Sequence, residues 1–191
     1  ALACAWVGDS RAVLASDADE STSTTGKLCA RDLTVDHSVL TNEKERQRVV
    51  DRGGSIAGPY VSHQHVEGLI QVTRSLGDAG YHRDDVLSAD PEVVIVSPVS
   101  PLARFVIVAS DGVWAVLSSN EAVDSVHTSL LSSGYYEAKR PAHEAHSSVL
   151  VACEALASLA MARAREGGGT DDVSVVLLTL APAAIARAKP P

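Results

Sequence analysis

Apolar residues along this chain fall into short strand-like runs at both ends and into helical spacing between them. Strands are predicted at 2–7, 11–16, 27–33, 69–72, 92–96, 105–108 and 173–180. Helices are predicted from Asn42 to Gly53, from Ser118 to about Leu131 and from Pro141 to Gly167. Strands come first, a helix pair follows and a strand returns, which is typical of an α+β domain with helices packed on an antiparallel sheet.

Two of these helices begin with a capping-box pattern, in which a polar N-cap residue is followed three residues later by Glu. The pairs are Asn42 with Glu45 and Ser118 with Glu121. Polar stretches without a period, at 17–26 and 77–88, predict loops, and 56–66 has no clear assignment. We expect residues 1–181 to form one partial domain and 182–191 an Ala/Pro-rich tail. The chain begins inside a predicted strand, without an initiator Met or a signal peptide, and we interpret it as a fragment.

Composition narrows the class of protein further. The 191 residues are 46% apolar and 21% charged, as in ordinary globular domains. A net charge of −8 argues against nucleic acid as a partner, because phosphates attract basic surfaces. Since no apolar run approaches the ~20 residues that cross a bilayer, we expect no membrane span. Three cysteines without metal-type spacing predict buried free thiols in a reducing compartment, so an intracellular location, cytoplasm or nucleus, is expected.

Asp111 is the most informative residue in the chain. The four apolar residues 105–108 predict a strand buried on both faces, and Ser110-Asp111-Gly112 follows that strand directly. An ionised carboxylate at the end of a buried strand is costly unless a cation or a hydrogen-bond donor compensates it. Gly112 permits a sharp turn or a close approach of another chain segment.

The same arrangement occurs at two other places. Asp9 follows the apolar run 3–7 and a glycine, and Asp171 lies between a glycine run and the strand 173–178. Three Gly-adjacent Asp residues at strand ends suggest oxygen ligands that converge on a hard divalent cation. The alternative for each is an ordinary turn or capping Asp, and for Asp9 a residue that stabilises a hairpin turn.

Six segments carry a stronger signal when they are taken together. They are Gly8–Leu14, Leu33–His37, Gly53–Gly54, Val72–Asp78, Ser110–Trp114 and Thr170–Val175. In their order and approximate spacing they resemble the metal-dependent type 2C protein serine/threonine phosphatases (PPM-type), over nearly the whole chain. The chain resembles the C-terminal part of that family's catalytic domain.

The resemblance implies a fold, a cofactor and a substrate class. The implied fold is an antiparallel β-sandwich flanked by antiparallel helices. Asp111 and Asp171 match the Asp residues that hold a Mg²⁺ or Mn²⁺, which activates a water to hydrolyse phosphoserine or phosphothreonine. Asp9 matches an Asp that helps to bind an additional, weaker ion, but Ala115 stands where the family usually carries a second Asp for that ion. Phosphoprotein substrates and a monomeric parent are implied as well.

The first half of the family's catalytic apparatus has no counterpart in this sequence. An Arg followed closely by Glu-Asp is absent, and so is the run Asp-Gly-His-Gly-Gly that bridges two metals. Beyond the metal ligands we therefore predict no catalytic residue, and the substrate-binding residues stay unassigned. We expect phosphatase activity in a full-length parent and none in this chain alone. The alternative is a non-catalytic pseudophosphatase that acts as a binding or regulatory module.

Several other residues receive a structural or no assignment. Arg74 and Asp78 are expected to hold a loop, His37 to hydrogen-bond at a helix entry, Trp114 to lie in the core, and Glu43–Arg48 to form a solvated helix face, while His63, His65 and His82 receive no role. An esterase reading of Gly8-Asp9-Ser10 with Asp124 and His127 is disfavoured. The amphipathic spacing around Asp124 and His127 already explains both residues as parts of a helix.

Overall fold

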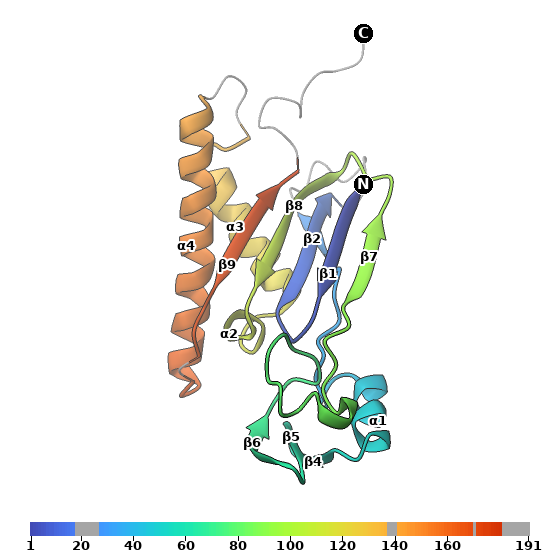
Figure 1. Ribbon diagram of the computed structural model, residues 1–191. Helices are drawn as coiled ribbons and strands as arrows, with labels where there is room; N and C mark the ends of the chain where they lie inside the picture. The colour runs from blue at the N-terminus through green and yellow to red at the C-terminus, as the bar shows by residue number, and fades with distance from the viewer. Residues whose placement is uncertain (18–26, 137–140, 170, 181–191) are drawn as a thin grey trace. The chain divides into compact units, whose positions relative to one another are not determined.

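The computed structural model describes residues 1–17, 27–136, 141–169 and 171–180, and it divides into two compact units (Figure 1). The first unit comprises Ala1–Ser10 and Thr34–Ser97, and the second comprises Arg11–Leu33 and Pro98–Pro191. Of the loop expected at 17–26, Asp17 lies in a strand instead, and the rest lies outside the described residues, as does the tail at 182–191. The interpretation of residues 1–181 as one partial domain stays a prediction.

The second unit is built on a four-stranded antiparallel sheet in the order β3-β2-β8-β9. Its strands are β2 (Arg11–Asp17), β3 (Leu28–Asp32), β8 (Ala103–Ala109) and β9 (Val175–Thr179), and its helices are α2 (Asp111–Trp114), α3 (Ser119–Ser132) and α4 (Ala142–Glu166). The single turn α2 was not predicted from the sequence. The predicted capping box of α3 is confirmed, because Ser118 and Glu121 bond to each other's backbone N–H in both directions.

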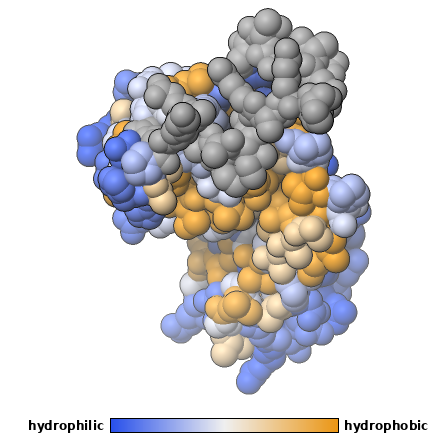
Figure 2. Space-filling model, turned by 90° about the horizontal axis from the view of Figure 1, so that it is seen from above, coloured by the Kyte–Doolittle hydropathy of each residue, from blue (hydrophilic) through white to orange (hydrophobic). Residues whose placement is uncertain are grey.

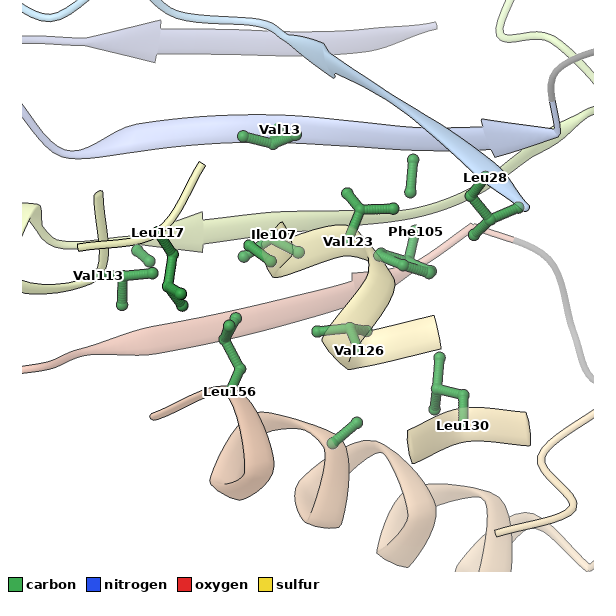
Figure 3. Close-up of a cluster of buried hydrophobic side chains, with 14 of the residues drawn as sticks. Val13, Leu28, Phe105, Ile107, Val113, Leu117, Val123, Val126, Leu130 and Leu156 are labelled. Atoms are coloured by element: carbon green, nitrogen blue, oxygen red, sulfur yellow. The ribbon is translucent and has the colours of Figure 1, made fainter. Parts of the chain in front are cut away.

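Alternate residues of the strands in the second unit point toward α3 and α4 and form one apolar core (Figure 3). Val13 from β2, Phe105 and Ile107 from β8, Val126 from α3 and Leu156 from α4 are all almost fully buried. Apolar residues recur at every second position on the strands and at every third or fourth position on the helices. These spacings explain why the first segments form strands and the second form helices.

The opposite face of this sheet keeps apolar side chains in contact with solvent. Val108 is 40% exposed, and its cross-strand partner Val176 is 62% exposed. Leu178, two residues further along β9, is 48% exposed. The prediction that 105–108 is buried on both faces is therefore wrong for Val108. Orange side chains reach the surface on the face of the molecule seen in Figure 2.

The first unit contains two small antiparallel sheets and one helix. Their elements are β1 (Leu2–Trp6) paired with β7 (Glu92–Val96), α1 (Glu43–Asp51), β4 (Ser55–Ala57), β5 (Tyr60–His63), β6 (Val66–Ile70) and the short 3₁₀ turn η1 (Arg83–Asp85). The sheet β4-β5-β6 covers most of the stretch 56–66 that the sequence left unassigned. On β1-β7 the exposed face is again apolar, with Val93 59% and Ile95 67% exposed.

The strands β1 and β2 are neighbours in sequence but belong to different sheets. Gly8-Asp9-Ser10 is therefore not a hairpin turn, and the hairpin alternative for Asp9 is wrong. Taken together, the antiparallel sheets and the helices confirm the expected α+β class.

Helix α4 bears on the expectation of no membrane span. Its length and composition alone would let it cross a bilayer, and it is the one helix in the described part of the chain that meets this test. Its buried stripe of Ala152, Leu156 and Ala160 belongs to the core that it shares with α3 and the sheet. Since a core helix passes the same test, the absence of a membrane span stays a prediction.

The three cysteines are free thiols, as expected, but their burial differs from the prediction. Cys29 is exposed on β3, whereas Cys4 and Cys153 are half-buried. Burial raises the pKa of both the Cys4 and the Cys153 thiols, which favours the protonated form. Edge strands leave one side chain in two facing outward, and this alternation places Cys29 at the surface.

Candidate metal centre

Asp111 is half-buried at the first position of α2, immediately beyond the end of β8. Its Oδ1 accepts a hydrogen bond of 3.0 Å from the N–H of Gly112. Trp114 is in the core, as predicted. Its Nε1 donates a hydrogen bond of 2.8 Å to the carbonyl of Ala109, which fixes the turn. The strand end and the packed indole together set where the Asp111 backbone lies.

The segment before β9 lies at the same end of the sheet as Asp111. Because β8 and β9 are antiparallel, Ala109 at the end of β8 pairs with Val175 at the start of β9. Ser110 then links the two segments by three hydrogen bonds. Its N–H donates to the Ser174 carbonyl at 3.1 Å, its hydroxyl donates to the Asp172 carbonyl at 3.1 Å, and its Oγ accepts from the Ser174 N–H at 3.0 Å.

Gly112 lies directly against this second segment. A Cβ atom at residue 112 would lie 2.4 Å from the Asp172 carbonyl oxygen, which is far inside van der Waals contact. The predicted role of Gly112 as a point of close approach is therefore confirmed. The structure brings together the two segments that carry Asp111 and Asp171, and Asp171 is exposed within its segment.

Asp9 belongs to the first unit, in which it follows β1 and is half-buried. The preceding Gly8 has φ +92°, in the left-handed region that favours glycine. The local backbone of Asp9 is therefore set by a residue that few side chains can replace.

Carboxylate and carbonyl oxygens suit Mg²⁺ or Mn²⁺, so the donors at this end of the sheet are of the right chemical kind. Among the described residues, however, no group of three or more His, Cys, Asp and Glu side chains converges on one point. Asp111 and Asp171 alone are too few side chains to make up a site of this kind. Ala115, one helical turn after Asp111, adds no oxygen.

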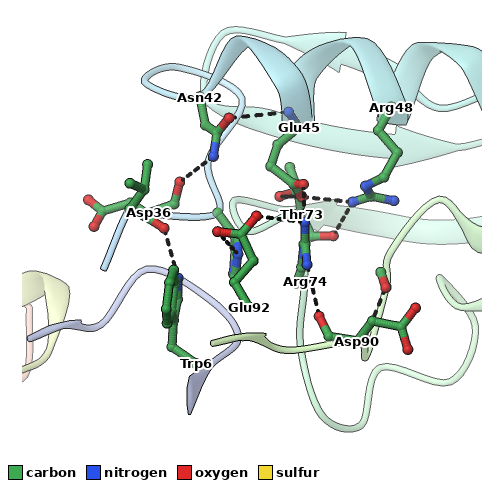
Figure 4. A network of polar contacts seen from close by, with 12 residues as sticks. Trp6, Asp36, Asn42, Glu45, Arg48, Thr73, Arg74, Asp90 and Glu92 are labelled. Atoms are coloured by element: carbon green, nitrogen blue, oxygen red, sulfur yellow. Dashed lines mark hydrogen bonds and ion pairs between the residues drawn. The ribbon is translucent and has the colours of Figure 1, made fainter. Parts of the chain in front are cut away.

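A buried ionic network in the first unit was missed by the sequence analysis (Figure 4). Glu45 is only 2% exposed, and it accepts hydrogen bonds from Thr73 at 2.6 Å, from Arg74 at 2.7 Å and from Arg48 at 3.0 Å. Burial alone would raise the pKa of Glu45, but the hydrogen bonds from Arg74, Arg48 and Thr73 outweigh burial and lower this pKa to about 2. The expected solvated face at Glu43–Arg48 is therefore wrong for Glu45. Asn42 does cap α1 by accepting the Glu45 N–H, but its own N–H donates to the Ser38 carbonyl, so the predicted capping box is only half formed.

Arg74 anchors its loop, as predicted. Its guanidinium bonds Glu45, the carboxylate of Glu92 at 3.2 Å and the carbonyl of Asp90 at 2.9 Å. The hydrogen bond to Glu45 raises the pKa of Arg74 further above its ordinary value. A sequence signal for Glu45 did exist, because the core residue Val49 follows it by four positions on the same helical face.

Two histidines differ from their predicted environments. His37 is fully buried and accepts a hydrogen bond from the Gly8 N–H at 3.0 Å, so it does not act at the helix entry. His63 lies in β5, also buried, with its Nε2 3.6 Å from the carboxylate of Asp84. No role was predicted for His63 from the sequence, and its burial in a strand beside a carboxylate was not foreseen.

Comparison with known proteins identifies the family. The family model "Protein phosphatase 2C" matches residues 1–168. The chain is 32% identical to probable protein phosphatase 2C 2 of Arabidopsis thaliana and 33% identical to probable protein phosphatase 2C 32 of Oryza sativa. The two matches span 94% and 91% of this chain but only 40% and 37% of the relatives' own length.

Solved structures agree with these matches. A serine-threonine phosphatase 2C from Toxoplasma gondii superposes with a TM-score of 0.68 at 22% identity, over 93% of this chain and 53% of that one. A sex determining protein of Caenorhabditis elegans superposes with a TM-score of 0.63 at 27% identity, over 95% of this chain and 37% of that one. From the matched family and the curated relatives, we conclude that the chain belongs to the protein phosphatase 2C family.

Proposed function

We propose that this chain forms part of a metal-dependent protein serine/threonine phosphatase that hydrolyses phosphoserine and phosphothreonine. The observation that carries the proposal is the convergence of Ser110–Gly112 with Asp171–Ser174 at one end of the β8-β9 pair. Two segments more than fifty residues apart are held together there by hydrogen bonds and by close backbone packing. Each of them carries an Asp beside the contact.

In this proposal the Asp111 and Asp171 carboxylates hold Mg²⁺ or Mn²⁺, and Asp9 helps to hold a further, weaker ion. A divalent cation supplies an activated water and offsets negative charge on the phosphate. The protein positions the carboxylates. The N–H of Gly112 orients Asp111, and the Ser110 hydroxyl fixes the backbone on which Asp171 is carried.

The activity belongs to a protein longer than this chain, which spans about two fifths of its curated relatives. Two carboxylates supply only some of the six or so oxygens that a hard cation binds. Neither carboxylate binds a phosphate. We propose a monomeric intracellular enzyme, in the cytoplasm or nucleus, that acts on phosphoproteins.

A second function is favoured by one observation. Because Ala115 contributes no oxygen and the described residues contain no three-ligand cluster, the site has fewer ligands than a tightly bound metal requires. A non-catalytic pseudophosphatase that binds phosphoproteins would keep the fold without needing a complete metal centre.

The test uses the 191-residue protein and a longer protein that contains it. We expect Mn²⁺-dependent hydrolysis of an aryl phosphate and of a phosphopeptide by the longer protein, and none by the 191-residue chain. Asp111→Ala in the longer protein should abolish turnover, whereas Asp124→Asn, which removes an exposed carboxylate from α3, should leave it unchanged. If the 191-residue chain hydrolyses these substrates and Asp111→Ala abolishes that activity, the conclusion that its site is incomplete is wrong. If the longer protein is inactive, the pseudophosphatase is favoured.

A further inference from the structure

His37 and Gly8 are joined by two hydrogen bonds that run in opposite directions. The His37 N–H donates to the Gly8 carbonyl at 3.0 Å, and the Gly8 N–H donates to His37 Nδ1 at 3.0 Å. Both polar groups of Gly8 are therefore held by one residue that lies far away in sequence. Asp9 is the next residue after Gly8, so the geometry of this pair determines where the Asp9 backbone begins.

The imidazole that makes this contact cannot easily move. It is fully buried, it stacks on the Trp6 indole with ring centroids 5.9 Å apart and planes 11° apart, and the His37 carbonyl accepts the Thr73 N–H at 2.9 Å. Trp6 is itself fixed by donating from Nε1 to the Val35 carbonyl at 2.9 Å. The ring is therefore held by Trp6 of β1, and the His37 backbone is held by Thr73.

The contact also defines which nitrogen of His37 carries the proton. Since Nδ1 accepts the Gly8 N–H, the proton of the neutral ring resides on Nε2. Nε2 lies 3.8 Å from the Glu92 carboxylate and has no hydrogen-bond partner in the described part of the chain. The charged groups that act on the ring are Arg74, Glu45, Glu92 and Arg48. Burial and the Arg74 charge lower the pKa of His37, which keeps Nδ1 free to accept.

The hydrogen bond from Gly8 is the one that the described part of the structure gives to the His37 ring. The hydrogen bonds that Glu45 and Arg74 make to Thr73, to each other and to Glu92 do not involve His37. Replacing Gly8 by a residue with a side chain would strain the left-handed backbone at φ +92°, although a Cβ there would meet only the Arg74 carbonyl at 3.7 Å. Gly8 therefore permits the backbone conformation that leads into Asp9, and the buried Nδ1 of His37 stabilises it.

We infer that His37 is a positioning residue, which fixes the Gly8 peptide so that Asp9 presents its carboxylate to a divalent cation. The inference rests on the proposed metal-dependent function. It assigns to a fully buried histidine, with no route to substrate, a defined effect on the affinity of one candidate ligand. Residues that orient metal ligands from behind typically change metal affinity by roughly 10- to 100-fold when they are replaced.

The test measures Mn²⁺ bound by the longer protein that contains this chain, from the loss of the free-ion electron paramagnetic resonance signal. His37→Leu keeps most of the ring volume but removes the acceptor, and His37→Gln is a second variant that places its carboxamide further out, in case the leucine variant does not fold. His37→Asn is the matched control, because its Oδ1 occupies the place of Nδ1 and can accept the Gly8 N–H. Asp9→Asn identifies the share of Mn²⁺ binding that depends on Asp9.

We expect His37→Leu and His37→Gln to weaken the Asp9-dependent binding by roughly tenfold or more, and His37→Asn to restore it to within about threefold of the original. Combining His37→Leu with Asp9→Asn should cause no loss beyond that of Asp9→Asn, because the histidine acts through the aspartate. A structural role alone would weaken binding equally in both backgrounds.

Four results would overturn the inference. The first is unchanged Mn²⁺ binding in His37→Leu and His37→Gln, and the second is a further loss in the double variant. The third is Mn²⁺ binding that Asp111→Asn lowers but Asp9→Asn does not, which would leave the proposed function standing without a role for His37. If neither Asp111→Asn nor Asp9→Asn changes Mn²⁺ binding, the proposed function fails and the inference fails with it.

Discussion

The carbonyl oxygen of Asp172 lies against the α-carbon of Gly112, so closely that a Cβ there would approach it to 2.4 Å. This contact connects the end of β8 to the segment before β9, beside the two Asp residues that form the candidate metal centre. A glycine is required at residue 112 because of space and not because of its backbone angles, since its φ is not in the left-handed region.

Replacing Gly112 should therefore separate the two segments. Gly112→Ala is expected to lower the free energy of unfolding by about 1–3 kcal/mol, because the backbone must shift to relieve the overlap. In a longer, active protein it should also reduce Mn²⁺ affinity. Urea denaturation followed by circular dichroism measures the first effect. Gly167→Ala is the control, because a Cβ there meets only carbonyls at 3.7 Å, and a loss as large in the control would refute the packing explanation.

Glu45 should make stability depend on pH in acid. Because its pKa falls from the ordinary 4.5 to about 2 on folding, its stabilisation is complete above about pH 5 and is lost as the pH falls toward 2. Glu45→Gln should remove this dependence and cost on the order of 3 kcal/mol at neutral pH, since Arg48 and Arg74 lose their buried partner. Denaturation between pH 2 and 7 measures both effects. Glu43→Gln, at an exposed position of the same helix, should change neither, and an unaltered acid profile in Glu45→Gln would contradict the network.

Ala115 offers a gain-of-function test. It follows Asp111 by one helical turn, and its N–H donates to the Asp111 carbonyl at 2.8 Å, so a carboxylate at this position lies on the same side of α2 as Asp111. Ala115→Asp should leave turnover of a longer protein intact and lower the Mn²⁺ concentration needed for the weaker ion. Asn120→Asp adds the same charge at an exposed position of α3. Equal tightening in both variants would show a general charge effect instead of ligation.

The apolar strand faces should be detectable in solution. We expect the 191-residue protein to bind the dye ANS and to scatter light above that of a monomer, because Val176 and Leu178 are exposed beside an edge of the sheet. Val176→Lys with Leu178→Lys should reduce both signals. Leu150→Lys, which changes a comparably exposed leucine (54%) on α4, should have a smaller effect. If the unsubstituted protein is monodisperse and does not bind ANS, these faces do not promote association.

Local patterns predicted much of the fold. Alternating and helical spacing identified the strands β1, β2, β3, β7, β8 and β9 and the helices α1, α3 and α4. Ser118 with Glu121 identified a helix start, because each of these signals depends on neighbours within a few residues. The strands β4 and β5 were missed, and the strand predicted at 69–72 overlaps only the end of β6. His63 and Gly68 break the apolar alternation in this sheet. The burial of Glu45 was missed because its partners Thr73 and Arg74 come from another part of the chain.

The candidate site shows the same division. The sequence pointed to Asp111 and Gly112, since an apolar strand that ends in Ser-Asp-Gly is a local pattern. The contact of Gly112 with Asp172 and the bonds from Ser110 depend on how β8 pairs with β9, which local spacing does not determine. His37 was assigned to the wrong partner for the same reason, because Gly8 is remote from it in sequence.

The pairing of β2 with β8 also has a consequence for how the chain folds. Arg11 pairs with Ala109, and the whole first-unit segment Thr34–Ser97 lies between these strands in sequence. The β2-β8 pair at the centre of the four-stranded sheet therefore cannot form until that intervening segment has been synthesised. Bringing β2 and β8 together closes a long loop, which has an entropic cost. During translation, β2 emerges from the ribosome long before its neighbour β8, with only β3 available as an early partner. The order in which the strands are made thus leaves an apolar strand exposed to chaperones or to misassembly until β8 arrives.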